Sequence, residues 1–202
     1  MKIDRKTVIL GTKNQDKLRE LQRLLAGSGI RAVSLRDFPK RKEVVEDGRT
    51  FEENARKKAR IYSKHSKGLV LADDSGLMVS YLKGKPGVYS ARFAGPGCNY
   101  RDNNRKLLRL LKTISGPKRA AKFVCVIALC DKGRFVGVVR GDCRGRIAPA
   151  EKGKNGFGYD PVFIPNGFSK TYAELSPKTK NRISHRGQAL RKAKRLLHDR
   201  LK

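Results

Sequence analysis

The residues best suited to chemistry in this sequence are two adjacent aspartates, Asp73 and Asp74, which follow an apolar run. That run, Leu69-Val-Leu-Ala72, is continuous, as expected for a strand buried on both faces. Carboxylates at the end of a buried strand are costly unless they bind something. Magnesium usually takes one or two carboxylates plus substrate phosphate, and Glu46 could join the pair. The alternative interpretation is that the two aspartates cap a turn.

A second polar segment, Leu10 to Lys17, joins a predicted strand to a predicted helix. Thr12 supplies a hydroxyl, Asn14 an amide and Lys17 a point charge, and the helix N-terminus adds exposed amides. Together these groups suit a phosphate. The segment matches neither of the two common glycine-rich phosphate motifs, and an ordinary polar turn into a helix would look the same. Its other polar residues are also candidates: Lys13, Gln15 and Asp16.

Two later segments have residues that suit a nucleotide base. The segment Gly156 to Pro161 reads Gly-Phe-Gly-Tyr-Asp-Pro, in which glycines permit close backbone approach and Phe157 and Tyr159 offer aromatic faces. Lys180 and the segment Ser184 to Gly187 add cationic and donor groups that could read a base edge or neutralise phosphate. The histidine in the last segment decides nothing by itself, because a lone histidine is more often structural.

Strands and helices must position these segments, and hydrophobic periodicity predicts both kinds. Thr50 and Glu53 match a capping box that opens a helix running to about His65. The other predicted helices are Asp16–Leu25, Asn99–Ile114 and Ser184–Leu201. The predicted strands are Thr7–Leu10, Ile30–Leu35, Leu69–Ala72, Lys122–Cys130 and Arg134–Arg140, the last with Gly141–Ile147 as a candidate extension. The predicted architecture is mixed α/β, one continuous domain over residues 1–202.

Composition limits the classes of partner. The formal net charge of +30 over 202 residues implies an anionic partner or an unusual surface adapted to a growth condition. The basic residues are spread along the chain, which argues against a detachable nucleic-acid-binding arm. No apolar stretch approaches the about 18 residues that a membrane span needs, so we expect a cytoplasmic protein without membrane contact. The four cysteines form no C-x-x-C pair and are expected to be reduced and structural.

Six motifs occur in order along nearly the whole chain: T-x-N-x-x-K, E-x-G-x-T-F-x-E-N-A, A-D-D-S-G-L, P-G-V-Y-S-A-R, F-G-Y-D-P and S-H-R-G-Q-A-L. Their combination resembles the inosine-triphosphatase-like family of noncanonical purine nucleotide pyrophosphatases, in its bacterial branch. The resemblance implies an elongated mixed β-sheet flanked by helices, with two lobes and an active-site cleft between them. It also implies a homodimer that needs Mg²⁺, or Mn²⁺ in its place. Such an enzyme cleaves inosine, deoxyinosine and xanthosine triphosphates to a monophosphate and pyrophosphate.

The resemblance also implies roles around the phosphates. Glu46 and Asp74 would bind magnesium, and Asp74 would also orient or deprotonate the attacking water. Asp73 would support them, and Lys58 would neutralise charge on the triphosphate. The phosphates would be held by residues of the first polar segment: Thr12, Asn14 and Lys17.

A second set of implied roles concerns the base. Phe157 would stack on it, and Ser75 would contact the substrate behind the second aspartate. The remaining residues would shape the pocket or read the 6-oxo group of the purine: Gly158, Tyr159, Asp160, Lys180, His185 and Arg186.

Three positions depart from the family pattern, and two rival interpretations stay open. Lys13 and Asp16 stand where small residues are frequent, and Val45 stands where a second acid often precedes the equivalent of Glu46. One rival is a Maf-like pyrophosphatase of other nucleotide specificity, against which the S-H-R-G-Q-A-L segment counts. The other is a basic nucleic-acid-binding module, which would leave the three carboxylates unexplained; nonspecific nucleic-acid binding could also accompany the enzyme.

Overall fold

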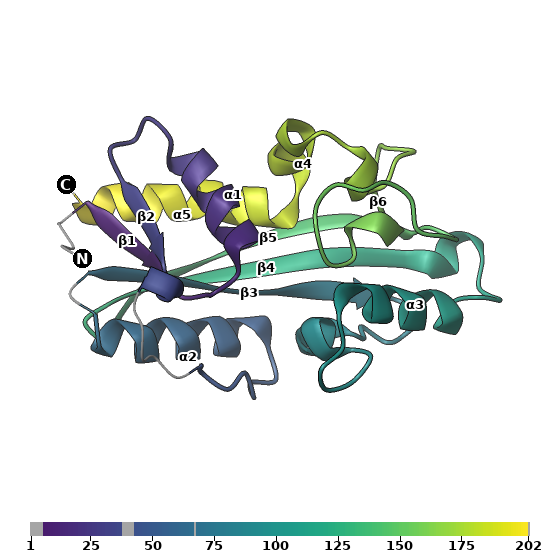
Figure 1. Ribbon diagram of the computed structural model, residues 1–202, viewed down its shortest axis with the longest axis horizontal. Helices are drawn as coiled ribbons and strands as arrows, with labels where there is room; N and C mark the ends of the chain where they lie inside the picture. Colours follow the sequence, from purple (N-terminus) through teal and green to yellow (C-terminus); the bar gives the residue numbers. More distant parts are fainter. Residues whose placement is uncertain (1–5, 38–42, 67, 202) are drawn as a thin grey trace. The chain divides into compact units, whose positions relative to one another are not determined.

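The computed structural model describes residues 6–37, 43–66 and 68–201. Its strands form a six-stranded sheet in the order β2-β1-β3-β4-β5-β6 (Figure 1). Strand β1 pairs in parallel with β2 and β3, whereas β5 and β6 are antiparallel, so the sheet is mixed as predicted. The bounds are β1 Thr7–Leu10, β2 Arg31–Ser34, β3 Leu69–Val79, β4 Ala120–Asp131, β5 Arg134–Ile147 and β6 Phe163–Pro165.

Five α-helices accompany these strands in the described residues: α1 Gln15–Leu25, α2 Phe51–Lys64, α3 Tyr100–Leu110, α4 Pro177–Ile183 and α5 His185–Leu201. The α/β prediction is therefore confirmed. The chain divides into two compact units. The first comprises residues 1–74, 125–141 and 187–202, and the second comprises residues 75–124 and 142–186. The predicted active-site cleft between two lobes stays a prediction.

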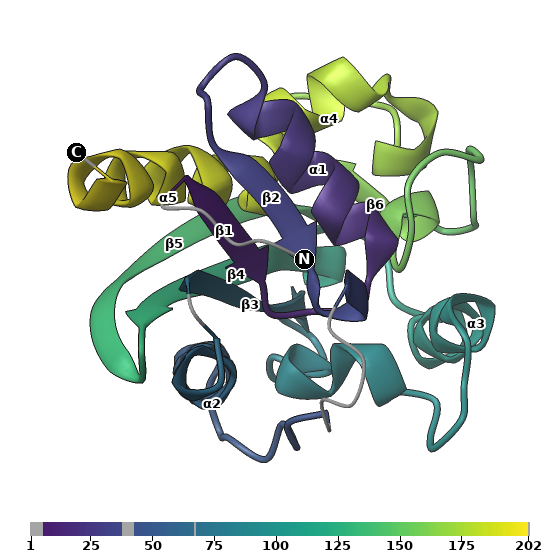
Figure 2. The ribbon, with the colours of Figure 1, turned by 60° about the vertical axis from the view of Figure 1, so that its left-hand side comes forward.

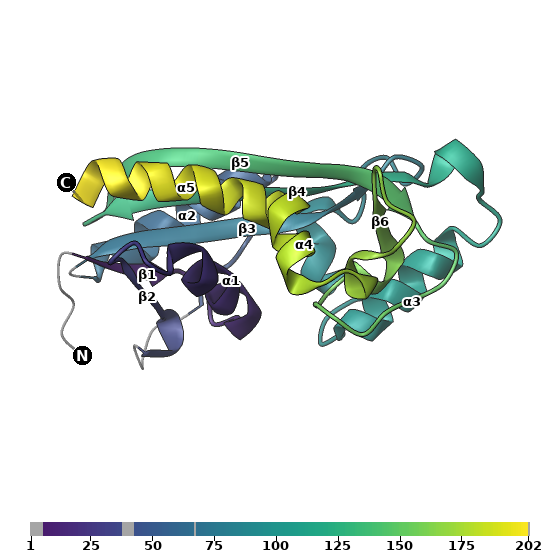
Figure 3. The same cartoon turned by 90° about the horizontal axis from the view of Figure 1, so that it is seen from above.

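The first unit buries both faces of its part of the sheet. Side chains alternate along a strand, so Val8 and Leu71 pack toward α1 and α5, while Ile9 and Val70 pack toward Tyr62 of α2 (Figure 2). Helix α5 runs alongside β5, as Figure 3 shows. The predicted apolar stripes of α1 and α5 are confirmed, with these residues buried: Leu18, Leu21, Leu25, Ala189, Leu190, Ala193 and Leu197.

Aromatic rings fill the core of the second unit. The Phe123 ring centroid lies 4.7 Å from that of Phe163 and 5.9 Å from that of Tyr172. Beside this core, the buried Arg119 guanidinium donates to four backbone carbonyls. Those carbonyls belong to the end of α3, the loop after it and the end of β5, so one side chain satisfies acceptors that would otherwise be buried without partners.

Several element boundaries differ from the sequence predictions. Strand β3 does not end before the two aspartates but continues to Val79. Helix α3 ends at Leu110 rather than Ile114, and β6 and α4 were not predicted. The predicted hairpin and the extension of its second strand are confirmed; Lys132 and Gly133, which join the strands, have φ of 47° and 81°. In the described residues all four cysteines are free, and no helix is long and apolar enough to cross a membrane.

Candidate functional site

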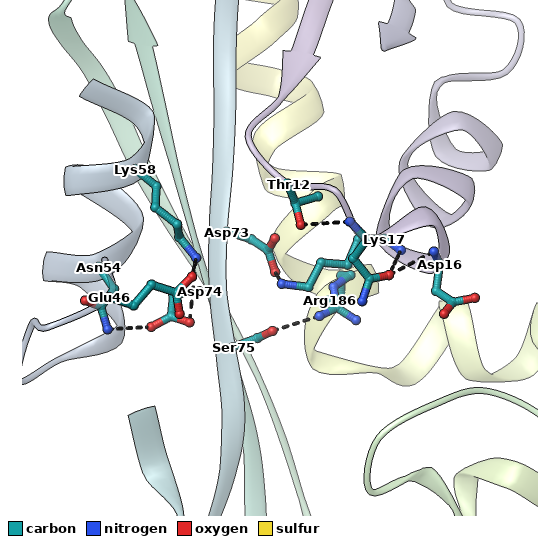
Figure 4. Close-up of polar contacts among 11 residues, drawn as sticks. Thr12, Asp16, Lys17, Glu46, Asn54, Lys58, Asp73, Asp74, Ser75 and Arg186 are labelled. Atoms are coloured by element: carbon teal, nitrogen blue, oxygen red, sulfur yellow. Dashed lines mark hydrogen bonds and ion pairs between the residues drawn. The ribbon is translucent and has the colours of Figure 1, made fainter. Parts of the chain in front are cut away.

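Strand β3 carries the two aspartates on opposite faces of the sheet, because successive side chains in a strand point in opposite directions. Figure 4 shows Asp74 directed toward α2 and Asp73 directed toward α1. Both residues are buried, with exposed fractions of 5% and 3%. The adjacent pair therefore does not form one two-carboxylate site; each aspartate belongs to a different group of side chains.

The group around Asp74 comes from α2 and the segment before it. Asn54 Nδ2 donates to Asp74 Oδ2 at 3.0 Å. Lys58 Nζ lies 2.5 Å from Glu46 Oε1 and 3.9 Å from Asp74 Oδ1, so one ammonium stands between two carboxylates. Asn54 and Lys58 are four residues apart on α2, which places them on the same side of the helix. Both are buried.

Glu46 is held in place by its neighbours on either side. The Val44 amide donates to the Tyr62 hydroxyl at 3.1 Å, and the Gly48 amide donates to Asn54 Oδ1 at 2.8 Å. A Cβ atom at Gly48 would lie only 2.7 Å from that same Asn54 oxygen, so glycine is needed for this approach. Val45 is 70% exposed, so an acid at this position would lie largely in solvent.

Helix α2 begins as predicted, with one difference in its cap. Thr50 Oγ1 accepts the Glu53 amide at 3.1 Å, which is the expected half of a capping box. The Glu53 carboxylate instead accepts the Arg49 amide at 2.7 Å. The cap fixes the first turn, and with it the orientation of Asn54.

Burial raises the pKa of the Asp74 carboxyl to about 6. The Lys58 ammonium and the hydrogen bond from Asn54 lower this pKa, whereas the nearby Glu46 charge raises it. Burial alone would lower the pKa of Lys58, but the charges of Asp73, Asp74 and Glu46 raise it overall. The group therefore sets two acidic side chains, Glu46 and Asp74, against one ammonium, and a further cation would offset the cost of burying Asp74 as a carboxylate.

These donors fit magnesium. Among the described residues no three acids, histidines or cysteines gather into one potential metal site. Glu46 and Asp74 supply the two carboxylates that magnesium commonly takes from a protein, with water and substrate phosphate completing its coordination. The structural observation that supports this fit is that Glu46 and Asp74 both face one cation, the Lys58 ammonium.

The group around Asp73 comes from the first polar segment. Lys17 Nζ lies 2.9 Å from Asp73 Oδ2. The Asn14 side-chain oxygen caps α1 by accepting the amides of Asp16 and Lys17 at 2.9 and 3.2 Å, and Thr12 Oγ1 accepts the Asn14 amide at 3.2 Å. The capping amides that suggested a phosphate site are therefore engaged by Asn14 in this structure.

The remaining polar residues of this segment lie at the surface or at the start of the helix. The Asp16 carboxylate pairs with Arg19, and Lys13 Nζ lies 3.2 Å from Glu43 Oε1. Gln15 is the first residue of α1. The two departures from the family pattern, Lys13 and Asp16, thus both have surface ion partners.

In the second unit, a buried ion pair fixes the predicted base-binding loop. Asp160 Oδ2 accepts the Phe157 amide at 2.8 Å and lies 2.6 Å from Lys180 Nζ. The Asp160 and Lys180 side chains are only 4% and 8% exposed. Gly156 has φ of 78° and leaves no room for a Cβ beside that carboxylate. Asp160 thus ties the loop before it to α4.

Two cations lie near the Phe157 ring. Lys180 Nζ is 4.9 Å and Arg186 Cζ is 5.3 Å from the ring centroid. Arg186 also donates to Ser75 Oγ at 2.7 Å, which links the start of α5 to β3 within this unit. His185 stacks on Phe123, with centroids 4.5 Å apart and planes 6° apart. The Phe157 ring therefore lies beside donors suited to a base edge.

One expectation about the aromatic residues is wrong. Tyr159 does not offer a ring face to a base, because it is 5% exposed and its hydroxyl donates to the Ser90 carbonyl at 2.9 Å. Burial raises the pKa of the Tyr159 hydroxyl above its usual value, in keeping with a structural role. Gly158 accepts from Asn104 Nδ2 at 3.1 Å. Tyr159 and Gly158 therefore support the loop that carries Phe157.

Sequence reasoning missed Asn54 and Asn104, which contact the site through hydrogen bonds alone. Asn54 carried a usable signal, since it lies one helical turn before Lys58 on the capped helix. Asn104 carried none, because its partner is a backbone carbonyl 54 residues away in the sequence.

Known proteins resemble this chain over nearly all its length. Residues 8–196 match the model of the Ham1 family. A dITP/XTP pyrophosphatase of Desulforamulus reducens is 47% identical over 191 residues, covering 95% of each chain. One of Geobacillus kaustophilus is 48% identical over 187 residues, covering 93% of this chain and 92% of that one. The structure of a HAM1 protein from Coxiella burnetii has a TM-score of 0.85 at 39% identity, covering 96% of this chain and 98% of that one.

Proposed function

Because the chain belongs to the Ham1 family, we propose that it hydrolyses noncanonical purine nucleoside triphosphates, namely those of inosine, deoxyinosine and xanthosine. The names of its dITP/XTP pyrophosphatase relatives support this substrate class. The observation that carries the proposal is the ion-paired group of Asp74 and Lys58, both buried, with the half-buried Glu46. The products are a nucleoside monophosphate and pyrophosphate, so the activity removes these triphosphates from the nucleotide pool.

The reaction is attack of water on the α-phosphorus, with breakage of the bond from that phosphorus to the oxygen bridging to the β-phosphorus. Asp74 accepts the proton of the water; its pKa, raised to about 6, suits a base that works near neutral pH. Lys58 and Lys17 stabilise the negative charge that develops on the phosphates. Magnesium, or manganese, held by Glu46 and Asp74 would add positive charge at the same place.

Recognition of the base is assigned to the second unit. Phe157 stacks on the purine, and Lys180, His185 and Arg186 supply donors to its 6-oxo group. Adenine has an amino group at position 6, which is also a hydrogen-bond donor. The donors of the protein would therefore be buried without an acceptor. Ser75 contacts the substrate and orients Arg186, with which it is already hydrogen-bonded.

Pyrophosphate release from a panel of nucleoside triphosphates tests the function directly. With magnesium, we expect rapid release from the triphosphates of inosine, deoxyinosine and xanthosine, and little from adenosine triphosphate. A chelator should stop release, and added magnesium should restore it. Preference for thymidine or uridine triphosphate would move the protein to the Maf-like class, and no release from any nucleotide would refute the proposal.

Asn54→Asp should lower turnover about 10–100-fold, the usual effect of losing a residue that orients a metal ligand. The variant keeps the acceptor for the Gly48 amide but replaces the donor to Asp74 with a like charge. Manganese affinity, measured by calorimetry on the protein without nucleotide, should fall together with turnover, because Glu46 and Asp74 lose their shared orientation.

Asn103→Asp provides the matched control. Asn103 is also buried, and it accepts the Ala94 amide and donates to the Ala91 carbonyl, neither of which has a proposed role. Any general cost of an asparagine-to-aspartate change in the interior should appear in both variants. Equal turnover and equal manganese affinity in the two would mean that Asn54 does not orient the site.

A further inference from the structure

The outer side of α2 carries a row of cations that the proposed reaction does not use. Arg56, Arg60 and Lys64 are spaced four residues apart and are all exposed. This spacing aligns them over about 12 Å along one side of the helix. Asn54 and Lys58 lie on a different side of α2, where they are buried. The row is therefore separate from the group around Asp74.

The turn between β4 and β5 extends this row with an aromatic ring. The Gly133 amide donates to Ser63 Oγ of α2 at 2.9 Å, which fixes the turn against the last turn of the helix. Arg56 Cζ lies 4.0 Å from the centroid of the Phe135 ring. Phe135 is 47% exposed, an unusual amount for a phenylalanine in a strand. We call the surface formed by these two elements the hairpin patch: Arg56, Arg60, Lys64, Lys132 and Phe135.

Most of the positive charge on the hairpin patch is not neutralised. Arg56 pairs with Glu52 at 2.7 Å. Across the described part of the chain, Arg60, Lys64 and Lys132 make no ion pair with an acid. The neighbouring Asp131 is engaged by Arg200 at 3.1 Å. Three cations without an acid partner thus lie on the elements that carry one exposed aromatic ring, so the patch attracts anions and offers a ring for stacking.

The positive charge and the exposed ring favour one class of partner. Self-association through the patch would bring like charges together, which disfavours a second copy of the chain as the occupant. An aromatic ring beside cations is the arrangement by which proteins hold single-stranded nucleic acid, with bases stacked on the ring and phosphates near the charges. Bases in a duplex are stacked on one another and are not available to an exposed ring.

We propose that the hairpin patch binds single-stranded nucleic acid, with Phe135 stacking on a base and Arg60, Lys64 and Lys132 contacting phosphates. This binding does not depend on the hydrolytic activity. It goes beyond the proposed function, because it assigns a polymeric partner to a surface outside the catalytic groups.

Fluorescence anisotropy with a labelled single-stranded oligonucleotide of mixed sequence tests the proposal. Arg60→Gln/Lys64→Gln should weaken binding and reduce the slope of log affinity against log salt by about 1.4, the value for two lost phosphate contacts. Phe135→Ala should weaken binding about fivefold or more, as expected for one lost stacking contact. Hydrolysis of inosine triphosphate should be unchanged in both variants, which shows that they are folded.

Two matched variants test whether binding occurs at the hairpin patch or results from the overall positive charge of the protein. Arg105→Gln/Arg109→Gln removes two exposed cations with the same spacing from α3, and Tyr81→Ala removes an aromatic ring that is 48% exposed. Both should bind the oligonucleotide nearly as well as the unaltered protein. Equal weakening by the α2 and α3 variants would overturn the proposal. So would tighter binding to duplex than to single strands, or binding only to vesicles of anionic lipid.

Discussion

Asp74→Asn should retain nucleotide binding while turnover falls by about 10²–10⁴-fold, the usual contribution of a general base. The substitution keeps the size of the side chain and can keep the hydrogen bond from Asn54 Nδ2. It removes the group proposed to accept the proton of water and one of the two proposed metal ligands. Pyrophosphate release and calorimetric binding of inosine triphosphate measure the two properties separately.

The same variant should be more stable than the unaltered protein when metal is absent. Because the pKa of Asp74 is raised from 3.8 to about 6 on folding, its contribution to stability is fully present below pH 3.8 and is lost as the pH rises through about 6. An uncharged asparagine avoids this loss, by about 1–3 kcal/mol at pH 8 given 1.36 kcal/mol per pKa unit. The melting temperature should therefore rise at pH 8 and change little at pH 4.

Asp199→Asn is the control for this pair of measurements. Asp199 is exposed near the end of α5, outside both groups of site residues, and its substitution should change neither turnover nor the melting temperature. Near-normal turnover in Asp74→Asn would contradict its assignment as the base. A variant that melts lower at pH 8 would instead show that the ionised carboxylate stabilises the fold, contrary to the cost of its burial.

The elements that the sequence predicted well are those whose signals are local. The strand Thr7–Leu10 has the predicted bounds, and Thr50 caps α2 at the predicted residue. Each depends on a run of apolar residues or on a side chain reaching an amide three positions away. Such signals lie within one short window, so a single sequence can reveal them.

The path of β3 could not be predicted in this way. The hydrophobic pattern predicts that the strand ends at Ala72, because charged residues are costly inside a sheet. The strand continues because distant residues satisfy both carboxylates: Lys17 reaches Asp73, and Asn54 and Lys58 reach Asp74. The same partners explain why two adjacent candidates separate onto opposite faces. Motifs identified the residues, but only the pairing of remote side chains shows which of them act together.

The ion pair of Asp160 and Lys180 gives a second large expected effect, this time on stability. Both side chains are buried and lie 2.6 Å apart. Lys180→Met removes the cation that lies against Asp160 and leaves a buried carboxylate without this ion pair. We expect a loss of about 3–5 kcal/mol in the free energy of unfolding, measured by urea denaturation without nucleotide.

Two further variants test whether the loss of stability in Lys180→Met comes from the buried Asp160 carboxylate that has lost this ion pair. Asp160→Asn/Lys180→Met removes both charges and should recover part of the stability, because an asparagine oxygen can still accept the Phe157 amide. Lys57→Met breaks the exposed pair with Asp47 and should have a much smaller effect. If Lys180→Met costs no more than Lys57→Met, solvent reaches Asp160, and the loop that carries Phe157 must be held by its backbone rather than by this pair. If the double variant recovers stability but binds inosine triphosphate poorly, the pair is retained for recognition of the base at some cost to the fold.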